Sequence, residues 1–183
     1  MEKVAVKVGI TGPTGSIKTE VLRKIIDILE KEGRIVQGVL VGEISNNGKV
    51  SGYTLFDLNT KKKVLFAEQS IISRVKIDRI GVDTRLLEEI LIPSLVKARE
   101  AADYIVIDEI GKLEGTTKAV QKEINNTLEF DKPIVVTLHK KSRNPVLQEI
   151  RSLESVRVFD LTPINKNILP FRVLRVLKGE EGS

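Results

Sequence analysis

The chain contains no cysteine, one histidine and few aromatic residues, which make up 4% of its 183 residues. The lack of cysteine excludes a disulfide scaffold, a cysteine zinc site and a thiol nucleophile. Because His139 is the single histidine, a histidine metal site and Ser–His catalysis are not expected. No apolar run approaches the ~20 residues that cross a bilayer. No basic segment followed by an apolar one opens the chain, so we expect a cytoplasmic protein without a membrane segment.

The residues that are present suit one globular domain over residues 1–183, with 41% hydrophobic and 30% charged residues. The net charge of +5 suits an anionic ligand such as a nucleotide. This excess is too small and too scattered to indicate nucleic acid binding. Abundant Lys, Glu and Ile are typical of proteins from thermophiles. The oligomeric state is not encoded in any pattern, and we expect a monomer.

Apolar periodicity predicts an alternation of strands and helices. We expect strands at 4–10, 35–44, 50–57, 62–66, 103–108, 133–138 and 156–159, and helices at 18–32, 84–102, 117–128, 144–152 and 167–177. Asp83 is expected to cap the second helix, and Pro93 to kink or divide it. The turn Asn46-Asn47-Gly48 predicts a hairpin. The fold class is therefore α/β: a mostly parallel sheet flanked by helices, with an antiparallel hairpin inserted at about 35–66.

A phosphate-binding loop is predicted between the first strand and the first helix. The pattern G-x-x-x-x-G-K-[ST] in that context wraps backbone N–H groups around a β-phosphate. Lys18 would reach the β- and γ-phosphates, and the Thr19 hydroxyl would bind Mg²⁺. The segment that matches the pattern is Gly12-Pro13-Thr14-Gly15-Ser16-Ile17-Lys18-Thr19.

One position of this loop departs from the pattern, because Ile17 stands in place of the second glycine. A β-branched side chain resists positive φ, at a cost of roughly 1–2 kcal/mol. Its bulk would also crowd a bound phosphate. An ordinary strand–turn–helix connection is the alternative interpretation of the loop.

Two carboxylates, Asp108 and Glu109, follow the buried strand Tyr104–Ile107. Ligands of open parallel sheets bind at the carboxyl ends of the strands. Asp108 is predicted to hold the magnesium shell, usually through water, and Glu109 to act as the base that orients the attacking water. A strand that ends in a solvated acidic turn is the alternative for this pair alone. The two motifs, in the right order, support each other and indicate nucleotide binding.

At this point the chain resembles a family of small P-loop nucleoside-triphosphatases, described from thermophiles and as a cancer-related NTPase. The resemblance covers nearly the whole chain and rests on these residues: Ile10–Pro13, Gly38, Glu43, Gly48, Gly52, Tyr53, Ile107–Glu114, Leu161–Pro163 and Asn165–Asn167. It implies a RecA-like α/β core and slow, Mg²⁺-dependent hydrolysis of ATP, GTP and other triphosphates with little base selectivity. It also implies a place for Glu114 close to the site. Departures from the family pattern are Ile17, Ser45, Ile80 and Lys166, and the last replaces an arginine.

Several other residues are open to two interpretations. Lys140, Lys141 and Arg143 could clamp a γ-phosphate, although such a run is more often a solvated loop. Thr137 could contact the γ-phosphate or be a buried hydroxyl. Asn165 could line the base or ribose pocket or cap the last helix.

Three functions follow from these patterns. The first is an NTPase that binds ATP or GTP. The second is a nucleotide-binding module with little turnover, because Ile17 replaces the glycine. The third is a P-loop nucleoside or small-molecule kinase. RNA binding is a weaker fourth possibility that rests on net charge alone.

Overall fold

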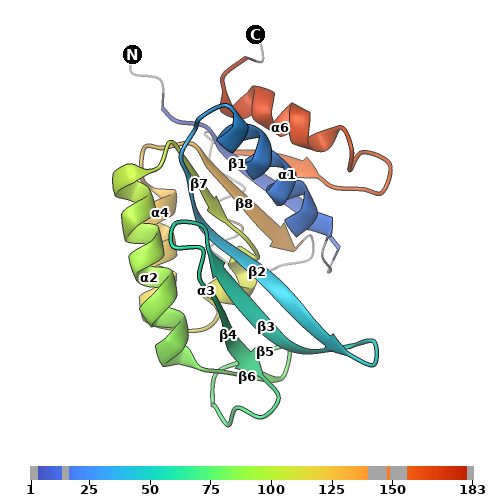
Figure 1. Cartoon of the computed structure of the whole chain (residues 1–183), viewed down its shortest axis with the longest axis vertical. Coiled ribbons are helices and arrows are strands. Elements are labelled where there is room, and N and C mark those ends of the chain that lie inside the picture. Colours follow the sequence, from blue (N-terminus) through green and yellow to red (C-terminus); the bar gives the residue numbers. More distant parts are fainter. Residues whose placement is uncertain (1–3, 14–16, 140–147, 149–155, 181–183) are drawn as a thin grey trace.

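The computed structural model describes residues 4–13, 17–139, 148 and 156–180. The described strands form a single nine-stranded sheet in the order β5-β6-β4-β3-β2-β7-β8-β1-β9 (Figure 1). The strands are β1 Lys7–Gly12, β2 Val36–Asn46, β3 Lys49–Asp57, β4 Lys63–Glu68, β5 Lys76–Ile77, β6 Ile80–Val82, β7 Tyr104–Ile107, β8 Ile134–His139 and β9 Val156–Asp160.

The sheet has a parallel half and an antiparallel half. Strands β2, β7, β8, β1 and β9 pair in parallel, as the alternation of strands and helices predicts. Strands β2, β3, β4, β6 and β5 pair antiparallel. The antiparallel insertion thus extends to Val82, beyond the expected limit near residue 66. Two very short strands, β5 and β6, account for most of the extra length.

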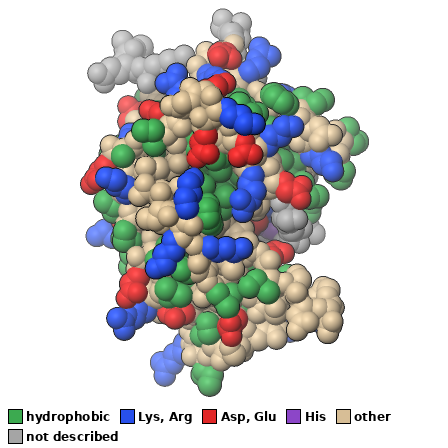
Figure 2. All heavy atoms as spheres, in the orientation of Figure 1, with side chains coloured by type: hydrophobic (Ala, Val, Ile, Leu, Met, Phe, Trp, Pro, Cys, Tyr) green, Lys and Arg blue, Asp and Glu red, His purple; other side chains and the backbone are tan. Residues whose placement is uncertain are grey.

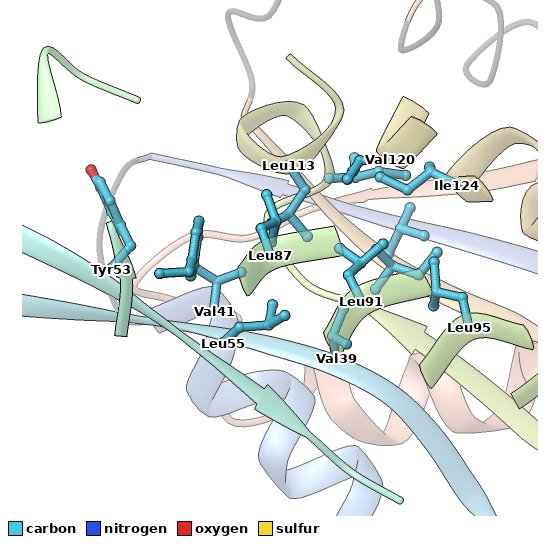
Figure 3. Packing of buried hydrophobic residues seen from close by; sticks show 14 of the residues in the cluster. Val39, Val41, Tyr53, Leu55, Leu87, Leu91, Leu95, Leu113, Val120 and Ile124 are labelled. Atoms are coloured by element: carbon cyan, nitrogen blue, oxygen red, sulfur yellow. The ribbon is translucent and has the colours of Figure 1, made fainter. Parts of the chain in front are cut away.

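Helices cover both faces of the sheet (Figure 1). They are α1 Ile17–Lys31, α2 Thr84–Ala101, α3 Ile110–Glu114, α4 Lys118–Leu128 and α6 Leu169–Leu177. On one face, α1 and α6 pack on alternate strand residues such as Ile10, Leu40 and Val106. On the other face, α2, α3 and α4 pack on the intervening residues, including Val39, Val41 and Ile107. Figure 3 shows this second cluster, with Leu87, Leu91 and Leu95 of α2 against Val39 and Leu55. The helix expected at 144–152 lies outside the described residues, apart from residue 148.

Local sequence signals explain several element boundaries. The Asp83 side chain accepts a hydrogen bond from Leu86 N, and Thr117 caps α4 in the same way through Val120 N. Pro93 lies inside α2, which continues through it as one helix rather than dividing there. Asn47 and Gly48 have φ of 49° and 76°, as the hairpin turn requires. The first strand begins at Lys7 and the last helix at Leu169, a few residues later than expected.

Gly38 lets β2 approach its neighbour β7. Its φ is +130°, and a Cβ at this position would lie 1.9 Å from the carbonyl oxygen of Val106. Any side chain would therefore separate β2 from β7, the strand that carries Asp108 and Glu109 at its end. None of the described helices is long and apolar enough to cross a membrane.

Candidate active site

The predicted site residues gather at one edge of the parallel half of the sheet. The phosphate loop follows β1, and Asp108 and Glu109 follow β7. Because β1, β8 and β7 are parallel neighbours, their carboxyl ends meet at the same edge. Within the loop, Gly12, Pro13 and Ile17–Thr19 are described, whereas Thr14, Gly15 and Ser16 lie outside the described residues.

Lys18 is fully buried and turned back toward the loop. Its Nζ donates to the carbonyl oxygens of Gly12 and Leu138, at 3.4 Å each. The same ammonium lies 3.3 Å from Glu109 Oε1. A Cβ on Gly12 would be 3.4 Å from Lys18 Cγ, an ordinary van der Waals contact, so the lysine side chain lies directly over the end of β1. Lys18 lies in the first turn of α1, and its ion pair with Glu109 was not foreseen from the sequence.

Ile17 is the first residue of α1 and does not have positive φ. The strain expected from an isoleucine in a glycine position is therefore absent, and that expectation is wrong. The side chain is 37% exposed and projects from the start of the helix. A helical φ is one that isoleucine adopts readily, which explains how the loop accepts this residue.

Asp108 is completely buried, and three segments donate to its carboxylate. Thr19 Oγ1 donates to Oδ2 at 2.8 Å, Val41 N donates to Oδ2 at 3.0 Å, and Thr137 Oγ1 donates to Oδ1 at 2.5 Å. Burial raises the pKa of this carboxyl to about 6, with Glu109 adding to the rise and the hydrogen bonds opposing it. The predicted pair of magnesium ligands, Thr19 and Asp108, is thus in direct contact.

Glu109 occupies a strained backbone conformation. Its φ and ψ are both 49°, in the left-handed region that few residues other than glycine enter. Its N–H donates to Thr137 Oγ1 at 2.7 Å, so one buried hydroxyl serves both carboxylate residues. Such strain persists only where the surrounding structure enforces it, and it is frequent at functional sites. Of the two interpretations of Thr137, the structure supports the one in which its side chain is a buried hydroxyl.

Two cavities border this cluster, and both are lined by Glu109 and Lys112. The first, about 230 Å³, opens at Thr19 between α1 and the β2–β3 hairpin and includes Arg23 and Tyr53. The second, about 360 Å³, lies beside His139 and Asp78. Sequence reasoning did not single out Arg23, Asp78 or Lys112. Asp78 and Lys112 are brought there by the short strands β5 and β6 and by α3, none of which has a periodic signal, whereas Arg23 lies on the periodic helix α1.

Asp78 lines the second cavity and contacts two residues that line the first, Tyr53 and Lys112. Its Oδ2 accepts hydrogen bonds from Tyr53 Oη at 2.5 Å and from Lys112 Nζ at 2.8 Å. The Lys112 ammonium also lies 5.2 Å from the centroid of the Tyr53 ring. Burial alone would raise the pKa of Asp78, but the hydrogen bonds from Lys112 and Tyr53 bring it below its ordinary value. In Figure 3 the Tyr53 hydroxyl points out of the apolar cluster.

Asn165 lies in the loop after β9, and its side chain orders that loop. Its Oδ1 accepts from Thr162 N and its Nδ2 donates to Asp160 O, both at 2.8 Å. It does not cap the last helix, whose N-cap is Ile168. The loop starts beside the phosphate loop, where Leu161 N donates to Thr11 O at 2.7 Å. Glu114 is buried in α3. The run Lys140, Lys141 and Arg143 lies outside the described residues.

The parallel sheet, the loop before α1 and the carboxylates after β7 define a P-loop nucleotide-binding protein. A family model described as NTPase matches residues 7–174. The chain belongs to this NTPase family.

Named relatives agree with this assignment. The chain is 67% identical to the nucleoside-triphosphatase THEP1 of Thermoplasma volcanium over 97% of this chain and 100% of that protein. The corresponding protein of Thermoplasma acidophilum is 66% identical over 99% and 100%. Among solved structures, THEP1 from the hyperthermophile Aquifex aeolicus matches with a TM-score of 0.81 at 27% identity, covering 94% of this chain and 99% of that one. A human cancer-related nucleoside triphosphatase, at 24% identity and a TM-score of 0.80, shares the fold over 97% and 100%.

Proposed function

We propose that the chain hydrolyses nucleoside triphosphates such as ATP and GTP to the diphosphate and inorganic phosphate. The observation that carries this proposal is the convergence of four predicted groups at one sheet edge. Thr19 contacts Asp108 at 2.8 Å, and Lys18 contacts Glu109 at 3.3 Å. Family membership and the triphosphatase relatives support the same reaction.

Magnesium fits the residues at this edge. A hydroxyl and a carboxylate are oxygen ligands, which a hard cation prefers, and Mg²⁺ takes its other ligands from water and phosphate. Thr19 and Asp108 would hold the ion, Asp108 through water. Bound there, Mg²⁺ would neutralise charge on the β- and γ-phosphates.

The protein's own groups supply the rest of the reaction. Backbone N–H groups of the phosphate loop and the Lys18 ammonium bind the triphosphate. A water oxygen then forms a bond to the γ-phosphorus while the bond from that phosphorus to the β–γ bridging oxygen breaks, leaving its electron pair on the diphosphate. Glu109 orients the water and accepts its proton. Because Lys18 is paired with Glu109, phosphate binding has to draw Lys18 away before Glu109 is free to act.

We also propose slow turnover with little base selectivity. Oδ1 and Nδ2 of Asn165 already make hydrogen bonds within its own loop, so the amide has only part of its hydrogen-bonding capacity left for a base edge. Turnover is slowed because Glu109 begins in an ion pair and has to be released in every cycle.

We further propose that residues 1–183 form one domain that acts as a cytoplasmic monomer without a nucleic acid partner. On the face seen in Figure 2, acidic and basic side chains are interspersed rather than gathered in one basic patch.

The test is phosphate release from ATP, GTP, CTP and UTP with and without Mg²⁺. We expect release to require Mg²⁺ and to fall by about 10²-fold or more in Glu109→Gln, because the base is lost while the side-chain shape is kept. Release that is unaltered in Glu109→Gln would show that Glu109 is not the base. Lys18→Ala serves as the control for phosphate binding.

The same assay separates hydrolysis from binding without turnover. We expect Ile17→Gly to leave the rate unchanged, because Ile17 has no backbone strain to relieve. A large gain in rate in this variant would mean that the isoleucine suppresses turnover and that the natural chain is a binding module.

A further inference from the structure

Lys112 lies beside the proposed base, although it belongs neither to the phosphate loop nor to the Asp108–Glu109 pair. It lies in α3, and its backbone N–H donates to Glu109 O at 3.0 Å, one turn from the proposed base. Its side chain lines both cavities that Glu109 lines. The first of these cavities also includes Thr19, the proposed magnesium ligand. The Lys112 side chain therefore borders the same space as the proposed base and the proposed magnesium ligand.

The present partner of Lys112 is easily exchanged. Its ammonium donates to Asp78, whose side chain is 59% exposed, whereas the Lys112 side chain is only 16% exposed. Ion pairs with a solvated partner contribute little to stability, so a phosphate oxygen can displace Asp78 at small cost. Asp78 is held in the β5–β6 turn with φ of 49° and also accepts from Tyr53, so it retains a donor when Lys112 leaves.

Arg23 is the competing cation of the first cavity. It follows Thr19 by one turn of α1 and is exposed. It also lines a separate hollow with Glu30 and Lys61. Unlike Lys112, it does not line the second cavity, beside His139. The position of Lys112 next to Glu109 favours Lys112.

We propose that Lys112 leaves Asp78 when a triphosphate binds and contacts the γ-phosphoryl oxygens, stabilising the charge of the transition state. This inference rests on the proposed hydrolysis and adds a catalytic residue to it. A cation bound at such a position stabilises the transition state more than the ground state, because the charge on the transferred group and its leaving oxygen changes during reaction. Asp78 is then a resting partner without a role in the chemistry.

The test compares Lys112→Met with Lys118→Met, an exposed lysine at the start of α4 that has the same charge change. We expect Lys112→Met to lower kcat by about 10²-fold with little change in KM, and Lys118→Met to have no such effect. Lys112→Arg should recover part of the rate. Affinity for Mg²⁺·ADP should stay the same in Lys112→Met, whereas affinity for Mg²⁺·ADP·aluminium fluoride, a transition-state mimic, should fall with kcat.

Three outcomes would overturn the proposal. The first is a Lys112→Met variant that behaves like Lys118→Met. The second is an equal loss of affinity for ADP and for the aluminium fluoride complex, which would indicate a structural role. The third is a loss in Asp78→Asn as large as that in Lys112→Met, or a larger loss in Arg23→Met. A rate unchanged in Glu109→Gln would instead count against the proposed function, so the two failures are distinguishable.

Discussion

The burial of Asp108 opposes the negative charge that its proposed role in magnesium binding requires. Three donors stabilise its carboxylate, yet burial outweighs them and raises its pKa to about 6. A carboxyl with a raised pKa holds its proton more tightly in the folded protein than in the unfolded chain. Its contribution to the free energy of unfolding is therefore complete below about pH 4 and is lost as the pH rises to about 6.

The raised pKa of Asp108 predicts that the free energy of unfolding of the nucleotide-free protein depends on pH. Between pH 4 and pH 7 the wild type should lose about 2–3 kcal/mol of unfolding free energy relative to Asp108→Asn, which cannot ionise. Urea unfolding of both proteins at intervals across this range measures the difference in their unfolding free energies. The contributions of the titrating groups that both proteins share cancel in this difference. A constant difference across the range would contradict the raised pKa.

At the residue scale, the sequence predicted which residues belong to the candidate site better than it predicted the contacts between them. Lys18, Thr19, Asp108 and Glu109 stand where the motifs place them. The Lys18–Glu109 pair joins residues far apart in the chain and depends on how β1 and β7 are arranged in the sheet, which no local pattern encodes. Lys112 was not singled out for the same reason, because its approach to Asp78 joins two segments far apart in the chain.

At the scale of elements, long periodic segments were predictable and short ones were not. The helix expected at 18–32 is α1, because its apolar positions recur over several turns. In contrast, α3 has five residues and β5 has two, which is too short for any period to show. The turn between β5 and β6 places Asp78 and Arg79 at positive φ without a glycine, so the usual turn signal is missing.

The contact of β2 with β7 gives a prediction at this scale. Gly38→Ala should destabilise the protein by more than about 4 kcal/mol, because its Cβ would overlap the Val106 carbonyl 1.9 Å away. Gly48→Ala is the matched control, since Gly48 also has positive φ but nothing lies within 4 Å of the added atom. That change should cost about 1 kcal/mol, the penalty of the left-handed backbone alone. Equal losses in chemical denaturation would show that β2 and β7 are less closely packed.

At the scale of the whole molecule, the candidate site joins the two apolar clusters. The Val41 N–H comes from a strand residue packed with α2, and Thr19 comes from α1 on the opposite face. A ligand that binds at this edge contacts groups from both layers, so it should stabilise the fold as a unit. The sequence predicted helices on both faces of the sheet, but the size of the antiparallel half emerged only with the pairing of β4, β5 and β6.

A thermal shift tests this coupling. Mg²⁺·ADP at about 100 times its Kd should add about 2.7 kcal/mol and raise the Tm by about 5–10 °C in a chain of this size. Lys18→Ala, compared with its own nucleotide-free Tm, should show a much smaller shift. Two separate melting transitions in the presence of nucleotide would indicate that the two layers unfold independently.

The carboxylate of Asp108 also has a bearing on how the protein folds. Its donors come from α1, β2 and β8, while Asp108 itself follows β7. No pair of neighbouring segments can assemble this arrangement, so the proposed magnesium site is complete only after all four have docked. Intermediates that lack any one of them would have no competent site. Nucleotide affinity during refolding would therefore report the docking of these four segments, and amide hydrogen exchange at Val41 should slow at the same moment.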